Sequence, residues 1–142
     1  MIELLAGILI VFPLVLLGRK NKYESWIYSL SLIILPVIYM VFGIFAEGEG
    51  VILKEFFYGL PFIAIGLISY IYGFKFSAYI VALFWLFHGG YDLYHNHLFI
   101  NTGVWSWYPV FCAGIDATLA IYLFSSATKW PQTNIKLSVK NV

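Results

Sequence analysis

The chain has 142 residues, of which 62% are hydrophobic and only 11% are charged, and its mean hydropathy is +0.88. A soluble domain carries about 25% charged residues, so this composition excludes an ordinary soluble protein and indicates an integral membrane protein. The formal net charge of +1 gives no reason to expect a nucleic-acid partner, and the single cysteine, Cys112, excludes an intramolecular disulfide and a cluster of several thiolates.

Five apolar segments are long enough, at ~1.5 Å per residue, to cover most or all of a bilayer core of roughly 30 Å as helices. The sequence therefore predicts an all-α polytopic membrane protein with a single transmembrane domain over residues 1–142. The start, Met-Ile-Glu before an apolar run, predicts a retained first span and no cleaved signal peptide. The expected spans cover residues 2–18, 26–46, 51–73, 76–94 and 108–126, and a polar tail follows at 131–142.

The basic residues predict the orientation of these spans, because Lys and Arg favour the cytoplasmic side of short loops. With five spans, seven of the eight Lys and Arg residues fall on one side, and Lys54 is the exception. The N-terminus is then expected outside and the C-terminus inside the cytoplasmic membrane. The seven residues are Arg19, Lys20, Lys22, Lys75, Lys129, Lys136 and Lys140.

The stretch HGGYDLYHNH, which begins at His88, holds all three histidines of the chain. A charged residue at the bilayer centre costs about 2.5–3.5 kcal/mol, so such a residue usually faces the bundle interior and has a partner. At ~100° per residue, His88, Asp92 and His95 share one helix face, whereas His97 points the opposite way. Asp116 lies at a similar depth in the fifth span, ~12 Å below the outer boundary, so we expect it beside His88.

These side chains have the chemistry of a metal site, because two imidazoles and two carboxylates suffice for zinc, iron or manganese. We expect His88, Asp92 and Asp116 to be ligands. His95 lies about 10.5 Å from His88 along a helix axis, so it joins them only if the helix bends, loosens near its end or supports a second ion. In an enzyme, His88, Asp92 and His95 would be the catalytic residues. Glu55, near the outer end of the third span, is interpreted as a contact to lipid headgroups.

Two other interpretations use the same residues. His88 with Asp92 or Asp116 would move a proton without a metal, in an isomerase or a proton-coupled carrier. Alternatively, the polar pair only holds two helices together, an interaction worth about 0.6–2 kcal/mol in a membrane. Gly89 and Gly90 permit either a bend in the helix or close packing on small residues of the fifth span, and packing is the preferred explanation.

The segments WLFHGGYDLYHNH (85–97) and FCAGIDATLAIYLF (111–124) resemble an uncharacterised family of small bacterial multi-pass membrane proteins. The resemblance implies a pattern of His, Asp and His on one helix with Asp on the next, in the bacterial inner membrane. The chain departs from this pattern at Tyr91, where Trp is expected, and at Asn96, where a second His is expected. In this sequence the pattern corresponds to His88, Asp92, His95 and Asp116.

A second similarity is to the five-span sterol isomerase superfamily, in which a membrane helix carries a His and a carboxylate four residues later, as His88 and Asp92 do here. This similarity implies metal-free proton transfer on a hydrophobic substrate. The leading hypothesis is instead an outer-leaflet metal site between spans four and five, in an enzyme that acts on a lipid-like small molecule, with membrane lipid as its partner. The third hypothesis is a non-catalytic membrane subunit whose polar pair only fixes helix packing, and both a homo-oligomer and a separate partner subunit stay open.

Overall fold

The computed structural model describes residues 1–20, 23–72 and 77–129, and this part of the chain is all-α. All five expected helices are present, and the largest difference in bounds is at the end of the fourth, which extends to Leu98. The elements are α1 (Ile2–Lys20), α2 (Glu24–Ile44), α3 (Val51–Tyr72), α4 (Ser77–Leu98), α5 (Tyr108–Ser126) and the 3-10 turn η1 (Ala127–Lys129). Some residues used above lie outside the described part of the chain: residue 73 at the end of the third expected span, residue 76 at the start of the fourth, Lys22, Lys75, Lys136, Lys140 and the tail 131–142.

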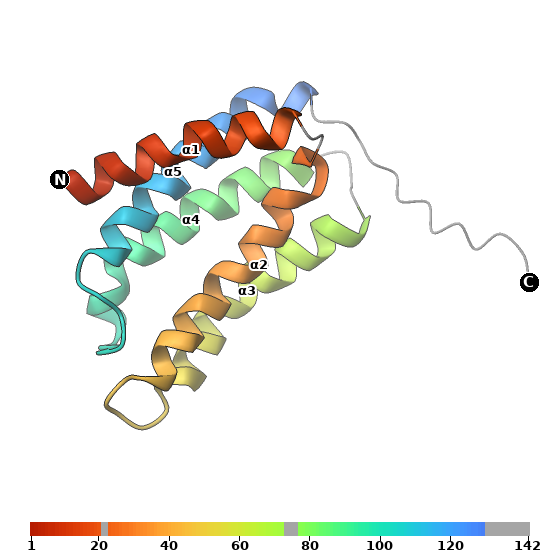
Figure 1. Ribbon diagram of the computed structural model, residues 1–142. Helices are drawn as coiled ribbons and strands as arrows, with labels where there is room; N and C mark the ends of the chain where they lie inside the picture. Colours follow the sequence, from red (N-terminus) through yellow and green to blue (C-terminus); the bar gives the residue numbers. More distant parts are fainter. Residues whose placement is uncertain (21–22, 73–76, 130–142) are drawn as a thin grey trace, which may run out of the picture.

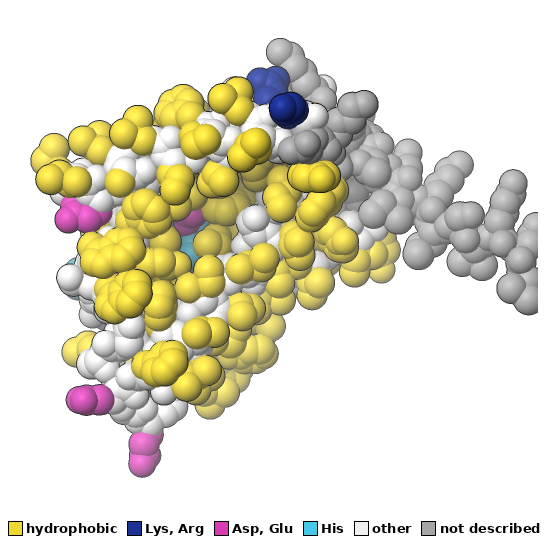
Figure 2. All heavy atoms as spheres, in the orientation of Figure 1, with side chains coloured by type: hydrophobic (Ala, Val, Ile, Leu, Met, Phe, Trp, Pro, Cys, Tyr) yellow, Lys and Arg dark blue, Asp and Glu magenta, His cyan; other side chains and the backbone are white. Residues whose placement is uncertain are grey.

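The helices run alternately up and down, so that their connections meet at two ends of the bundle (Figure 1). The backbone N–H of Glu47 donates to Thr102 Oγ1 at 2.7 Å, which joins the α2–α3 connection to the α4–α5 connection. We call this the acidic end, because most of the exposed Asp and Glu side chains in Figure 2 lie toward it, and we call the other end, where the Lys and Arg side chains of that view lie, the basic end. Lys54 near the start of α3 and Glu24 at the start of α2 are exceptions. The predicted orientation depends on this separation of charge.

In the described part of the chain, four helices are long and apolar enough to cross a membrane: α1, residues 26–44 of α2, α3 and α5. Their outward surface is largely apolar (Figure 2). The helix α4 has 22 residues but is not among the four, because its His and Asp residues lower its hydropathy. It packs against α2, α3 and α5, and its residues His88, Asp92 and His95 are buried at these contacts. The fold is therefore that of a helical membrane protein in which α4 turns a polar face toward its neighbours.

Glycines allow the helices to approach each other closely. A Cβ added to Gly59 on α3 would overlap the Pro36 side chain on α2, and a Cβ on Gly7 of α1 would overlap the backbone oxygen of Phe111 on α5. Small residues of this kind are the usual interface of membrane helices, because the bilayer provides no hydrophobic force between them. The pairs α2–α3 and α1–α5 are thus held at a short separation by residues without side chains.

The helix α4 continues without a break through Gly89 and Gly90. A Cβ on Gly89 would lie 3.1 Å from Asp116 Cβ and 3.6 Å from the Ala113 backbone oxygen, whereas a Cβ on Gly90 would have no atom within 4 Å. The packing explanation is therefore confirmed for Gly89 and wrong for Gly90, which faces open space. Close packing at Gly89 brings α5 against α4 at the level of Asp116.

An apolar layer fills the bundle on the basic side of His88 and Asp116. Trp85, one turn from His88, is 2% exposed, and its indole N–H donates to the Tyr28 backbone oxygen at 3.2 Å. Leu32 and Leu119, from α2 and α5, pack in the same core. This layer separates the polar residues of α4 from the basic end of the bundle.

Candidate metal site

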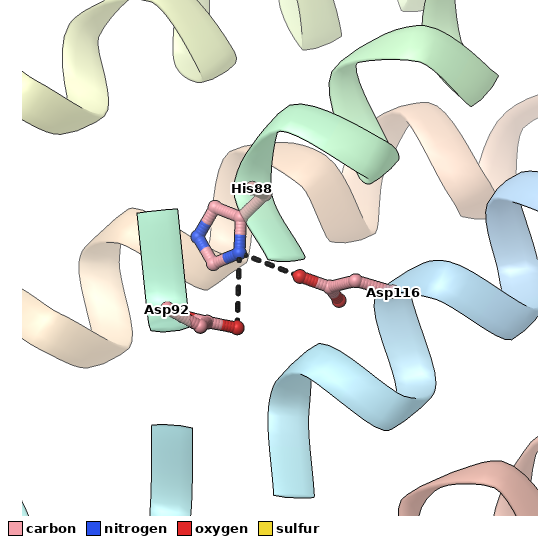
Figure 3. A group of neighbouring side chains, drawn as sticks. All are labelled: His88, Asp92 and Asp116. Atoms are coloured by element: carbon pink, nitrogen blue, oxygen red, sulfur yellow. Dashed lines mark hydrogen bonds and ion pairs between the residues drawn. The ribbon is translucent and has the colours of Figure 1, made fainter. Parts of the chain in front are cut away.

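Two residues one turn apart on α4, His88 and Asp92, face Asp116 on α5 (Figure 3). His88 Nδ1 lies 2.8 Å from Asp116 Oδ2 and 3.6 Å from Asp92 Oδ2. One ligand atom from each residue lies within 4.8 Å of the other two. The prediction that His88 and Asp116 lie side by side is confirmed, and Asp92 completes a group that we call the triad.

All three side chains of the triad are buried, at 1%, 2% and 0% exposure for His88, Asp92 and Asp116. Within the described chain, His88 Nε2, Asp92 Oδ2 and Asp116 Oδ1 have no hydrogen-bond partner. A buried polar atom without a partner costs about 1–3 kcal/mol, and more when the group is charged. Asp92 Oδ2 and Asp116 Oδ1 belong to the two carboxylates that face His88 Nδ1, whereas His88 Nε2 lies on the far side of the ring (Figure 3). The two carboxylates therefore have unused capacity to bind a group besides their own side-chain partners.

The charges of the triad do not balance. Two carboxylates carry two negative charges, and one imidazole supplies at most one positive charge. No described Lys or Arg side chain forms an ion pair with these residues. Because an uncompensated charge in a buried site costs several kcal/mol, the triad requires either a bound cation or an additional proton.

The third residue of the α4 stripe, His95, lies outside the triad. Its Nε2 is 2.8 Å from Glu55 Oε1 on α3, and its side chain is 0% exposed. The same carboxylate accepts a hydrogen bond from Asn101 Nδ2 at 2.7 Å and one from the Tyr91 hydroxyl at 2.7 Å. We call Glu55, Tyr91, His95 and Asn101 the Glu55 network. It is fully hydrogen-bonded at its carboxylate, in contrast to the triad.

The interpretation of Glu55 as a headgroup contact is wrong, because its side chain is 1% exposed. The rotation of α3 turns Glu55 toward α4, and the connection at 99–107 brings Asn101 over it. His97 is exposed, as its position on the opposite face predicts. Cys112 is buried and is a free thiol.

Tyr39 on α2 is the site residue that sequence reasoning missed. Its hydroxyl donates to Asp92 Oδ1 at 2.7 Å, and its side chain is 1% exposed. The chain contains 11 tyrosines, and no spacing distinguishes this one from the others. Its role depends on a contact between helices 53 residues apart in the sequence.

No protein-family model, curated protein or solved structure matches the chain. The resemblance to a family of small bacterial membrane proteins therefore stays a prediction. The fold and the site define the class of the protein: a helical membrane protein with a buried His/Asp/Asp group that is able to hold a metal ion.

Proposed function

We propose that His88, Asp92 and Asp116 bind one divalent metal ion, which is zinc, iron or manganese. The observation that carries this proposal is the convergence of three buried ligand atoms within 4.8 Å. Ligands bound to zinc at 2.0–2.1 Å in a tetrahedral site lie about 3.3 Å from each other. The distance from His88 Nδ1 to Asp116 Oδ2, 2.8 Å, is slightly shorter than this ligand separation, and the distance to Asp92 Oδ2, 3.6 Å, is slightly longer.

A divalent ion also accounts for the charge of the triad. It neutralises both carboxylates and leaves the imidazole neutral, which is the form that binds metals. One nitrogen and two carboxylate oxygens suit zinc, iron and manganese. A positive charge at this position removes the need for a protonated carboxylate in the membrane interior.

Three protein ligands leave a coordination position open, which is typical of catalytic metal sites. An ion bound there supplies Lewis acidity and lowers the pKa of a bound water. We therefore propose an enzyme that acts on a lipid-like substrate. The apolar outer surface of the bundle supports this substrate class (Figure 2), because such a molecule reaches the protein from within the bilayer.

The apolar layer around Trp85 favours an enzyme over a proton-coupled carrier. A carrier needs a polar path from the site to both ends of the bundle. On the basic side of the triad, Leu32, Trp85 and Leu119 are 0%, 2% and 4% exposed and pack together. Leu32 and Leu119 carry no polar side-chain atom, and the Trp85 indole N–H is taken by the Tyr28 backbone oxygen, so these three side chains form no chain of donors and acceptors.

Elemental analysis of the purified protein tests the metal site. The detergent-solubilised chain is washed with chelator, reloaded with zinc, iron or manganese, and desalted. We expect about one ion per chain in the wild type and none in Asp116→Asn or His88→Ala, because each variant removes one of three ligands. His97→Ala is the matched control, since this exposed histidine lies on the same helix, and it should retain the ion.

Thermal unfolding separates the metal site from the alternatives. A metal ion that binds the folded chain raises its unfolding temperature, so Zn²⁺ should stabilise the wild type and His97→Ala but not Asp116→Asn. A folded wild type that accepts none of the three metals contradicts the proposal and leaves metal-free proton transfer. Loss of stability in Asp116→Asn, with no metal bound by the wild type, indicates a pair that only packs two helices.

A further inference from the structure

Tyr39 connects the triad to the Glu55 network. Its hydroxyl donates to Asp92 Oδ1 at 2.7 Å, and its backbone oxygen accepts from Asn101 Nδ2 at 3.4 Å. Its ring lies on the ring of His95, with 4.8 Å between the centroids. Tyr39 is therefore held at three points: its hydroxyl by Asp92, its ring by the ring of His95 and its backbone oxygen by Asn101.

The hydrogen bond from Tyr39 distinguishes the two oxygens of Asp92. Oδ1 is occupied by the phenol, whereas Oδ2 has no hydrogen-bond partner and is the oxygen nearest to His88 Nδ1. Because the Tyr39 hydroxyl is bonded to only one of the two oxygens, it fixes the orientation of the Asp92 carboxylate about its Cβ–Cγ bond. The carboxylate presents a single oxygen to an ion placed between Asp92 and its neighbours in the triad.

We propose that Tyr39 is a positioning residue for the metal site. It orients Asp92 as a ligand through Oδ2 alone, and the Glu55 network holds Tyr39 in place. This inference rests on the proposed function of the triad. Groups that hydrogen-bond to a metal ligand fix its orientation, and their loss typically costs 10–100-fold in metal affinity. The helix α2 supplies no ligand to the metal site, but through Tyr39 it sets the orientation of one ligand.

The variant Tyr39→Phe removes only the hydroxyl that holds Asp92. We expect the Kd for Zn²⁺, measured by competition with a chromogenic chelator in detergent, to rise about 10–100-fold while saturation stays at one ion per chain. Tyr122→Phe is the matched control. It also removes a partly buried phenol hydroxyl, but that hydroxyl donates to Glu24 at the basic end of the bundle, so the Kd should be unchanged.

A double-mutant cycle tests whether Tyr39 acts through Asp92. In the Asp92→Glu background, which keeps a carboxylate ligand and a measurable Kd but moves it relative to the Tyr39 hydroxyl, Tyr39→Phe should cause a much smaller rise in the Kd. An equal rise in both backgrounds, or a Kd in Tyr39→Phe equal to that of the wild type, overturns the positioning role. A wild type that binds no Zn²⁺ overturns the proposed function itself.

Infrared spectroscopy tests the same inference through the way in which Asp92 binds the ion. On addition of Zn²⁺, a carboxylate that binds through one oxygen shows a wide separation between its antisymmetric and symmetric stretching bands. Appearance of this band pair in the wild type, and a narrower separation in zinc-saturated Tyr39→Phe, supports ligation through Oδ2 alone with Tyr39 holding the carboxylate. A change confined to the narrow separation of carboxylates that bind through both oxygens overturns it.

Discussion

Replacing Glu55 by Ala is expected to lower the free energy of unfolding by about 3–5 kcal/mol, because it removes a buried carboxylate whose two oxygens are both hydrogen-bonded. The carboxylate lies 2.8 Å from His95 Nε2 and accepts hydrogen bonds of 2.7 Å from Asn101 Nδ2 and from the Tyr91 hydroxyl. The alanine variant leaves these three groups buried without their shared acceptor. Denaturant unfolding of the detergent-solubilised protein, followed by circular dichroism, measures the loss.

Two other substitutions make this result specific. Glu49→Ala removes an exposed carboxylate at the acidic end and should leave the free energy of unfolding unchanged. Glu55→Gln keeps an amide oxygen that still accepts a hydrogen bond, so its loss should fall between those of the two alanine variants. If Glu55→Ala unfolds at the same denaturant concentration as Glu49→Ala, the Glu55 network does not stabilise the fold.

Gly7→Ala is the second substitution with a large expected effect on stability. The added Cβ would overlap the backbone oxygen of Phe111 and would lie 3.2 Å from the backbone nitrogen of Ile115. Backbone atoms do not move aside as a flexible side chain does, so α1 must shift away from α5. Overpacking of this kind costs about 1–3 kcal/mol. The midpoint of thermal unfolding in detergent should therefore decrease.

The matched control is Gly90→Ala, also within a helix. A Cβ there would have no atom within 4 Å, so the substitution has no steric cost and gains about 0.5–1 kcal/mol of helix propensity. We expect the unfolding midpoint to rise slightly in Gly90→Ala and to fall in Gly7→Ala. Equal increases in both variants would mean that α1 and α5 are not in close contact in the detergent-solubilised protein.

Much of the fold followed from the lengths of the apolar segments. A chain in a bilayer must satisfy its backbone hydrogen bonds internally, so each long apolar segment has to form a helix. The pairing of His88 with Asp92 followed from the helical period, and counting residues from the outer boundary placed Asp116 at the same depth. These are local properties, and the structure agrees with them.

The partners of His95 and Asp92 did not follow from the sequence. Glu55 lies near the end of a span, where a glutamate is equally suited to contact lipid headgroups or a neighbouring helix. The residue type alone therefore does not distinguish these two contacts. The choice depends on the rotation of α3 about its axis, which is set by close packing such as that of Gly59 on Pro36. Tyr39 was hidden for the same reason, since a tyrosine on an apolar helix is ordinary until its partner is known.

The sequence by itself determined the helical membrane class, the helix positions and the pairing of His88 with Asp92 and Asp116. Only the tertiary structure decided that His95 belongs to Glu55 and that Tyr39 holds Asp92. The physical reason is that helix period and apolar length are set within one segment. The rotation of each helix, in contrast, is set by contacts with neighbours that are distant in the chain.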